Sequence, residues 1–593
     1  MFKNIDKNTV LGIFLIVLMV GLYTWNLSKK AKTMATQAPI SVDSSAIIKD
    51  TLSSIQTTVP TSKDTTVTVV DSTPNKQFIL ENDLIKIEFS SHGGDINNIV
   101  LKKYTTYENK PVHLLDKNKT KWNYNFPTQT GNINTSKESF SLVSNTNGVL
   151  TLSSNSGVIL TYTLLNNSYK LSQKWNVPGY IKDKKTTLSI QTEMDQQEAN
   201  LTRERQYSTI MYLQDGDSYV EKLSLNKNDA LTTEKSFKYL TFAQQFFNVS
   251  ILPSRSFEKG YLKSFYMENE INYVKKYLAE LTLLPQDSLS FEYFLGPSSY
   301  KLLKAENNDL HKIIPLSQDI VIFRWMKIFN EFFIIPIFDF LSQFFSNYGV
   351  IIFFLTLIVK LLLTPLSFKT FRSGVAMKVL KPELDKLKAK HGDDQQAFAQ
   401  EQMKIFNEYG VSPLGGCMPM LLQMPILFAM FSFFPAAIEL RHEPFLWASD
   451  LSTYDNVLTL PFTIPFYGNH VSLFALLMTA TQIATTVYTQ RLQPSSPQAD
   501  QMKMMSYIMP LIFLFMFNSF PAAITYYYLL QNVMSIFQQW FVTKFFIDEN
   551  KIRAEIEEHK KKPKKQGMFQ KKMQEMMAQA EEQKKMQQKN NKK

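Results

Sequence analysis

Long apolar runs dominate the second half of the chain. The run Phe340–Leu366 contains one charged residue, Lys360, and exceeds the roughly 20 apolar residues that a membrane-spanning helix needs. Between Lys503 and Lys544 no residue is charged over about twice that length, so we expect two spans, separated by a break at Asn518–Pro521. With two further uncharged runs, the pattern predicts spans at 341–366, 411–438, 471–490, 504–520 and 521–545.

Another uncharged run covers residues 8–28 near the N-terminus. It has the length of a span or of a signal peptide, but no small-x-small cleavage site follows it closely. We therefore favour a retained transmembrane anchor at 1–30, with a cleaved signal peptide as the alternative. Residues 31–75 are rich in Thr, Ser, Val and Asp without a helical period, and are predicted to be a flexible linker.

The chain between 76 and 320 has a different pattern. Short runs such as Leu84–Phe89 and Ile159–Leu164 alternate apolar and polar residues, and Asn, Gly, Ser and Pro separate them. Many period-two strands at short spacing predict an antiparallel β-sandwich or barrel. His92–Asp95, with its two glycines, is interpreted as a turn rather than a site. We find no nucleophile elbow, zinc-ligand spacing or P-loop here, and no residue that singles out a saccharide-binding face.

Two segments beside the spans combine helical periodicity with many charges. In residues 321–340 charged and aromatic side chains interleave, which is typical of an amphipathic helix in the membrane surface. Residues 367–410 carry two apolar stripes joined by a turn at His391–Asp394, and Pro382 is expected to kink or restart the first helix. We predict a helical hairpin whose stripes face each other or the bilayer. Its eight Lys and Arg residues place it in the cytoplasm.

The distribution of positive charge predicts the topology. The loop 491–503 and the tail 546–593 follow the spans with basic residues, so both are expected in the cytoplasm. The segment 439–470 contains Arg441 as its one Lys or Arg and is expected outside, as is the domain 76–320. The chain then crosses the membrane six times, with both termini cytoplasmic. Its single cysteine excludes an internal disulfide framework and a cysteine metal cluster.

Several polar residues lie inside the predicted spans. A lysine near the bilayer centre costs about 2.5–3.5 kcal/mol, so Lys360 needs water, a partner or a function, unless its side chain snorkels to the headgroups. Thr364 lies one turn beyond it. Lys360 and Gln423 are the best candidates for a hydrated cavity within the membrane. For Gln482 and Asn532 we favour hydrogen bonding between helices, the commoner use of such residues in membranes.

The sequence SPLGGCMPMLLQMPILFAMF, followed by ELRHEPF, resembles the YidC/Oxa/Alb family of membrane protein insertases, in its Gram-negative bacterial type. The resemblance continues through FPAA and YYY to QQ at 538–539 and covers most of 340–545. The outer domain matches loosely, through SSHGGDINNIVL. The resemblance implies a polytopic α-helical protein of the cell inner membrane, with six spans, a five-helix insertase core and a large periplasmic all-β sandwich domain.

The resemblance also implies the function. Such a protein inserts, folds and helps to assemble membrane proteins through a hydrophilic groove, alone or with the Sec translocase. It makes no bond, so we expect neither enzymatic activity nor a cofactor. Lys360 stands where the family most often has an arginine, and keeps the charge without the planar fork of donors. The implied groove residues are Lys360, Thr364, Gln423, Tyr527, Tyr528 and Asn532.

The expected partners are nascent membrane proteins, Sec translocase subunits, the ribosome and the phospholipid bilayer. From Lys551 onward the tail has 14 Lys and Arg against 6 Asp and Glu, in a chain of net charge +12. Such a tail favours ribosomal RNA, while anionic lipid and a solvated tail remain alternatives.

Two other functions remain open at this stage. An intramembrane cation is typical of secondary transporters and channels, although the spans show no inverted repeat. An intramembrane hydrolase would need a nucleophile, and no serine signature occurs. The one histidine that borders the last four spans is His470.

Overall fold

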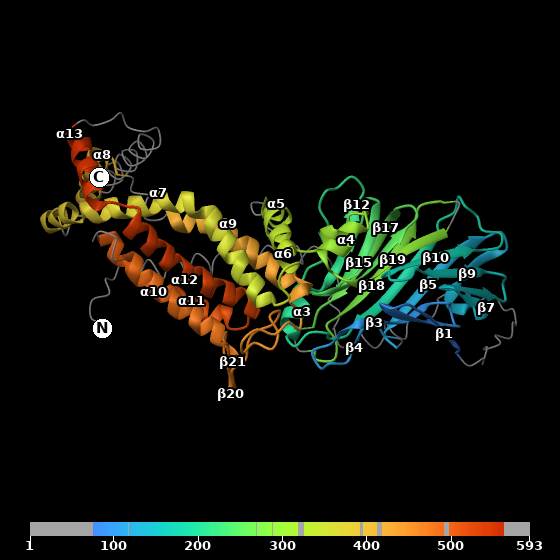
Figure 1. The fold of residues 1–593 in the computed structure, drawn as a ribbon. Helices are drawn as coiled ribbons and strands as arrows, with labels where there is room; N and C mark the ends of the chain where they lie inside the picture. The colour runs from blue at the N-terminus through green and yellow to red at the C-terminus, as the bar shows by residue number, and fades with distance from the viewer. Residues whose placement is uncertain are drawn as a thin grey trace, which may run out of the picture. The chain divides into compact units, whose positions relative to one another are not determined.

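The computed structural model describes residues 75–116, 118–267, 270–286, 289–317, 325–391, 395–411, 418–490 and 497–561. The expected anchor (1–30), nearly all of the expected linker (31–75), Cys417 and the end of the tail lie outside these residues. The strands fall mainly in the first half of the chain and the long helices in the second (Figure 1).

The strands form two antiparallel sheets. The smaller sheet has the order β1-β2-β3-β4 and contains β1 (Gln77–Glu81), β2 (Ile85–Ser90), β3 (Ile96–Thr105) and β4 (Pro111–Leu115). The main path of the larger sheet is β6-β5-β11-β18-β17-β15-β16-β19-β10-β9-β8-β7; β12 pairs with β13 and β15, and β14 with β17. Its 15 strands are β5 (Thr120–Thr128), β6 (Gly131–Asn134), β7 (Phe140–Thr146), β8 (Val149–Ser154), β9 (Ile159–Leu164), β10 (Lys170–Asn176), β11 (Thr187–Met194), β12 (Thr209–Gln214), β13 (Glu221–Lys222), β14 (Asp229–Thr232), β15 (Phe237–Ala243), β16 (Phe247–Pro253), β17 (Phe257–Phe265), β18 (Lys275–Leu283) and β19 (Leu289–Pro297).

The two sheets share one core, which confirms the predicted sandwich. The alternating pattern buries every second residue, for example Leu160, Tyr162 and Leu164 on β9. The ring centroid of Phe89, from the smaller sheet, lies 4.3 Å from the ring centroid of Tyr162 on β9 of the larger sheet.

The expected turn at His92–Asp95 joins β2 and β3. Gly93 and Gly94 have φ of +77° and +67°, which favours glycine. A Cβ on Gly94 would also lie 2.6 Å from Leu160 Cδ2, so the turn needs glycine for space as well as for conformation.

The helices begin with two short ones in the β-rich half and continue to the end of the described chain. A π-helical turn (Asn330–Ile334) joins α5 to α6, and a hairpin of two strands, β20 (Leu458–Ile464) and β21 (Gly468–Val471), precedes α10. The helices are α3 (Leu201–Tyr207), α4 (Tyr300–Ala305), α5 (Trp325–Phe329), α6 (Ile335–Ser342), α7 (Tyr348–His391), α8 (Gln395–Glu408), α9 (Met418–Phe433), α10 (Leu473–Gln490), α11 (Pro497–Phe517), α12 (Ala522–Phe545) and α13 (Glu549–Lys561).

The helix boundaries differ from the predicted ones around α7. The apolar run from Phe340 is broken, because α6 ends at Ser342 and α7 begins at Tyr348. From there α7 runs for 44 residues through Pro365 and Pro382. Of the two effects predicted for Pro382, a kink or a restart of the helix, the restart is therefore wrong. Leu380 and Leu384 are buried on either side of Pro382, whose own side chain is exposed. Packing on that face outweighs the local cost of the proline.

The apolar stripe of the predicted hairpin is covered by a helix that the sequence analysis missed. Leu380 and Leu384 of α7 and Phe406 of α8 form a separate hydrophobic cluster with Ile552 and Ile556 of α13. Two ion pairs add to the contact, Arg372 with Glu555 and Lys378 with Glu549 (2.8 Å). The start of the expected basic tail is therefore a packed helix.

Among the described residues, α7 is the one helix long and apolar enough to qualify as a candidate span by length and hydropathy. The apolar stretches Gln423–Ala436 and Met505–Phe517 are shorter. α10 and α12 are long but carry several Thr and Gln residues. The expected break between the last two apolar helices is confirmed, since α11 ends at Phe517 and α12 begins at Ala522.

Candidate functional site

Lys360 lies on the face of α7 that packs against α12. Only 8% of its surface is exposed, and its Nζ donates a hydrogen bond of 2.6 Å to Ser535 Oγ. Ser535 in turn donates to the carbonyl oxygen of Gln531, one turn earlier on α12, at 2.6 Å. A cation of α7 is thus held by a hydroxyl of α12.

Thr364 extends this contact by one turn. Its Oγ1 donates to the carbonyl oxygen of Lys360 (2.9 Å) and accepts from Gln538 Nε2 (2.8 Å). Lys360, Thr364, Ser535 and Gln538 therefore form a line of polar contacts between α7 and α12, which we call the polar seam. Its members are three or four residues apart on each helix, so they share one face.

The charge of Lys360 is not neutralised within the described part of the chain. No ion pair of Lys360 occurs there, and Ser535 is its one side-chain partner. An ammonium group has three donors. Two of them remain for water or for another molecule, because leaving them unpaired in an apolar environment would cost several kcal/mol.

Tyr527 and Tyr528 lie elsewhere on α12. Tyr528 packs against Phe431 of α9 and Phe517 of α11, and Tyr527 against Phe434. Eight residues separate Tyr527 from Ser535, about 12 Å along a helix. Among the described residues the Tyr527 hydroxyl has no hydrogen-bond partner. The two tyrosines belong to a packed aromatic cluster rather than to the polar seam.

The other two candidates are also separate from the seam. Asn532 Nδ2 donates to the carbonyl oxygen of Met478 and to Thr481 Oγ1 on α10, both at 3.3 Å. That is the contact between helices that was favoured for Asn532 from the sequence. Gln423 is half-buried on α9, and no hydrogen bond joins it to the polar seam.

Ser535 and Gln538 were not among the site residues predicted from the sequence. The available signal was the repeat of polar residues at 531, 535 and 538, with steps of four and three. This repeat marks one face of α12, but single polar residues in a helix do not tell which neighbouring helix they meet.

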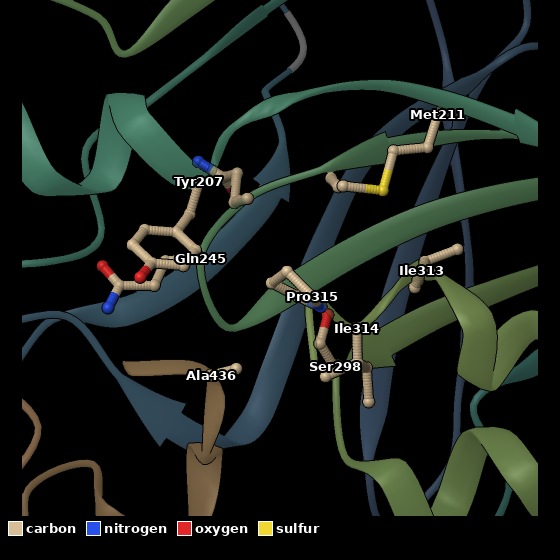
Figure 2. A pocket seen from close by; sticks show the side chains of 10 residues that line it. Tyr207, Met211, Gln245, Ser298, Ile313, Ile314, Pro315 and Ala436 are labelled. Carbon is tan, nitrogen blue, oxygen red and sulfur yellow. The ribbon is translucent and has the colours of Figure 1, made fainter. Parts of the chain in front are cut away.

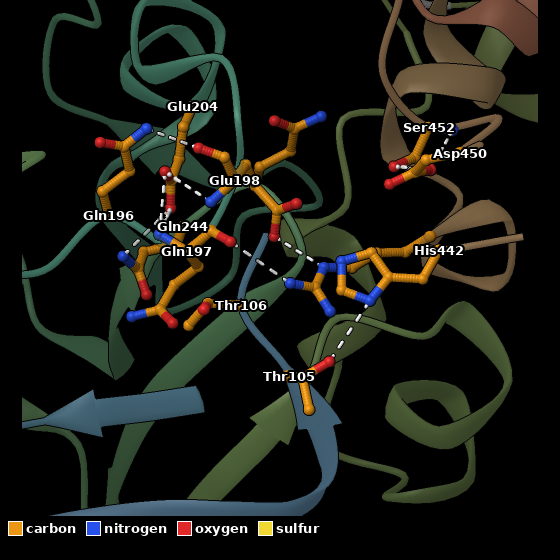
Figure 3. A network of polar contacts seen from close by, with 12 residues as sticks. Thr105, Thr106, Gln196, Gln197, Glu198, Glu204, Gln244, His442, Asp450 and Ser452 are labelled. Carbon is orange, nitrogen blue, oxygen red and sulfur yellow. Dashed lines mark hydrogen bonds and ion pairs between the residues drawn. The ribbon is translucent and has the colours of Figure 1, made fainter. Parts of the chain in front are cut away.

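A second polar network joins the β-sandwich to the segment that follows α9 (Figure 3). Arg441 Nε donates to Glu198 Oε1 at 2.7 Å, and both side chains are buried. Glu204 of α3 accepts from the backbone N–H groups of Gln197 and Glu198, at 3.1 Å to its nearest oxygens. Burial raises the pKa of Glu198 to about 7, against the opposing effect of Arg441. Burial, followed by the charge of Glu198, raises the pKa of Glu204 well above its ordinary value.

A small cavity lies beside this network (Figure 2). Two of its polar side chains are already bonded: Gln244 Nε2 donates to the carbonyl oxygen of Asp195 (2.8 Å), and Gln245 Nε2 to that of Pro435 (3.2 Å). No group of three or more His, Cys, Asp or Glu side chains that could hold a metal ion occurs in the part of the chain that the structure describes. The cavity is lined by Tyr207, Met211, Ala243, Gln244, Gln245, Ser298, Ile313, Ile314, Pro315 and Ala436.

Comparison with known proteins covers nearly the whole chain. Residues 340–551 match the family described as 60Kd inner membrane protein, and residues 78–329 match the YidC periplasmic domain. A membrane protein insertase YidC of Amoebophilus asiaticus is 36% identical over 595 residues, which are 95% of this chain and 97% of that protein. One of Parabacteroides distasonis is 32% identical over 95% of this chain and 96% of its own length.

A crystal structure of an active YidC insertase, with its first transmembrane domain resolved, is also similar. It covers 80% of this chain and 94% of that chain, with a TM-score of 0.33 and 18% identity. The relatives and the two family matches show the family of this chain. The chain belongs to the YidC family of membrane protein insertases, inner-membrane proteins that carry a periplasmic β-domain and are not enzymes.

Proposed function

We propose that this insertase receives the polar flank of a nascent membrane protein at the polar seam between α7 and α12. The observation that supports the proposal is the buried ammonium of Lys360, whose one side-chain partner among the described residues is the neutral hydroxyl of Ser535. Its remaining donors would hold water or bind a client carbonyl or carboxylate. Either would lower the several-kcal/mol penalty of moving polar groups toward hydrocarbon.

The proposed topology has six spans and a cytoplasmic location for both termini. The spans would be the anchor at 1–30, the first part of α7, and α9 to α12. Exposed apolar side chains on α11, such as Leu511 and Ile512, suit contact with lipid tails. The helix from Trp325 to Ser342 has a buried face with Asn330 and Ile334 and an exposed face with Phe332, as a helix in the membrane surface would.

We further propose two sets of partners beyond nascent membrane proteins and lipid. The β-sandwich would contact Sec translocase subunits or folding clients outside the membrane. The basic residues beyond α13 would contact ribosomal RNA, with a steep dependence on salt because counterions are released from phosphates. Anionic lipid is the competing ligand for the same charges.

The experiment that tests the seam is site-specific photocrosslinking. A photoreactive amino acid at position 364 or 538 should crosslink to a ribosome-bound nascent membrane protein. The matched control is position 361, next to Lys360 on the same helix, where the Leu361 side chain is 62% exposed and outside the seam. Equal crosslinking from 361 and 364 would contradict the proposed entry surface. Crosslinks from 423 and 527 but not from 364 would instead place the client beside α9 and the aromatic cluster.

A further inference from the structure

The strands β20 and β21 form a hairpin (Figure 1). This hairpin exposes several apolar side chains. Phe466 at its tip is 96% exposed, Phe462 61% and Leu458 57%. Five of the seven residues of β20 are exposed, on both faces of the strand. Residues 456–490 contain no Asp, Glu, Lys or Arg. Leu458 and Phe462 lie on one face of β20, and Thr459 and Thr463 lie on the other. Exposing an apolar face of this kind to water is unfavourable, so this face needs another environment.

The base of the hairpin is fixed to the ends of two long helices. Asn518, just after α11, donates from Nδ2 to the carbonyl oxygens of Tyr467 (2.9 Å) and His470 (2.8 Å). Its Oδ1 accepts from the backbone N–H of Ser472, just before α10 (2.9 Å). His470 Nε2 lies 3.0 Å from the carbonyl oxygen of Asn518, and the ring of Tyr454 stacks on it at 3.7 Å. The exposed phenylalanines are therefore held at a set distance from the ends of α10 and α11.

The chemistry of the hairpin selects the membrane interface over the hydrocarbon core. Two strands leave outward N–H and C=O groups without partners, and the centre of a bilayer cannot satisfy them. Pro461 removes one N–H group of β20. Interfacial amphipathic helices bury Trp, Phe and Leu side chains at the boundary between headgroups and acyl chains, and at this depth the backbone groups of a hairpin stay hydrated.

We propose that the hairpin Leu458–Val471 lies in the headgroup region of the outer leaflet, with Phe462 and Phe466 in contact with phospholipid. The occupant of this surface is lipid, because the surface is uncharged and continuous with the ends of helices that the proposed function places in the membrane. The hairpin thereby sets the depth of α10 and α11 in the bilayer. This inference depends on the proposed spans, and the test below separates the two.

The test measures how deeply a fluorophore on the hairpin lies in the membrane. In the full-length protein, Cys417 is replaced by serine, and single cysteines are introduced by Phe466→Cys, Leu511→Cys or Ile271→Cys. Each protein is labelled with an environment-sensitive dye and reconstituted into phosphatidylcholine–phosphatidylglycerol vesicles. The vesicles contain a lipid quencher placed near the headgroup or deep in the acyl chain. Ile271, 78% exposed on the β-domain, is the control outside the membrane, and Leu511 on α11 is the control within it.

The dye at 466 should be quenched by the shallow lipid at least about twofold more than by the deep one, as for groups buried roughly 5–10 Å into the interface. The dye at 511 should favour the deep quencher, and the dye at 271 should respond to neither. Quenching at 511 but not at 466 would overturn the hairpin proposal and leave the spans intact. Absence of quenching at both would overturn the spans as well. A dye at 466 shielded from both lipids and from aqueous iodide would show a protein partner in place of lipid, which also contradicts the proposal.

Discussion

Lys360 Nζ donates a 2.6 Å hydrogen bond to Ser535 Oγ, so a cation of α7 is held by a neutral hydroxyl of α12. A structural ion pair would place a carboxylate here, and none pairs with Lys360 among the described residues. A neutral partner fixes the position of the ammonium but leaves its charge available. The proposed function requires such an available charge, because Lys360 would act on the polar flank of a nascent membrane protein.

Insertase activity should require the positive charge at position 360 but not the shape of the lysine side chain. Lys360→Arg is expected to support growth of a strain depleted of its own insertase, because an arginine keeps the positive field. Lys360→Ala should lose most activity by removing the charge that hydrates the seam, and Lys360→Glu should repel acidic client flanks. Growth supported by Lys360→Glu at normal protein levels would contradict the charge model.

Ser535→Ala should destabilise the contact between α7 and α12 by about 1–3 kcal/mol, because the buried ammonium loses its partner. A lower thermal midpoint of the full-length protein in detergent would show this. The matched control is Thr485→Ala on α10, whose hydroxyl also bonds a carbonyl one turn back but has no cation beside it. The double variant Lys360→Met with Ser535→Ala should regain stability without regaining insertion, since it removes charge and partner together. If it regains neither, the seam is mainly a packing contact.

Much of the fold could be predicted because local pattern and tertiary packing agree. In the sandwich, period-two runs such as Ile159–Leu164 become strands with one buried face. The break at Asn518–Pro521 ends one helix and starts the next, since a proline and a polar pair stop a helix wherever it packs.

The misses occurred where packing between distant segments decides the outcome. Only two isoleucines mark the buried face of α13 in a strongly charged sequence, so this segment was predicted as part of the basic tail. The continuation of α7 past Pro382 likewise depends on α8 and α13, which bury Leu380 and Leu384. Within the candidate site, the sequence could indicate that Tyr527 and Asn532 were special. It could not indicate that Tyr527 packs against Phe434, or that Asn532 bonds to α10.

The helix α13 should stabilise the helical hairpin of α7 and α8. Truncation after Asn550 removes Ile552 and Ile556 and exposes Leu380 and Leu384, so proteolysis within 367–410 should become markedly faster. Truncation after Lys561 is the matched control, because it removes the rest of the tail and keeps α13. The two truncations also separate ribosome binding from stabilisation of the hairpin. We expect both truncated proteins to lose co-sedimentation with ribosomes. Only the protein truncated after Asn550 should be digested faster. Equal proteolysis of both proteins would show that α13 does not hold the hairpin.

Glu198 should make the stability of the contact between the β-sandwich and the segment that follows α9 depend on pH. Its pKa is about 7 in the folded protein and near 4.5 when exposed, because burial outweighs the attraction of Arg441. Between these values the folded state holds a proton that the unfolded state has released. The contribution of Glu198 to the free energy of unfolding is therefore full below pH 4.5, and is lost as the pH rises to about 7.

The variant Glu198→Gln isolates this contribution, since it keeps the shape and cannot ionise. Other carboxyl groups also change stability with pH, for example Glu81, whose pKa is lowered by Lys102, so the informative quantity is the difference between variant and wild type. As the pH rises from 5 to 8, the thermal midpoint of Glu198→Gln should rise relative to that of the wild type. The reason is that only the wild type must then bury a second charge beside Arg441. Movement in the opposite direction would mean that the 2.7 Å ion pair with Arg441 outweighs burial. The network would then stabilise the junction through its charge rather than through a retained proton.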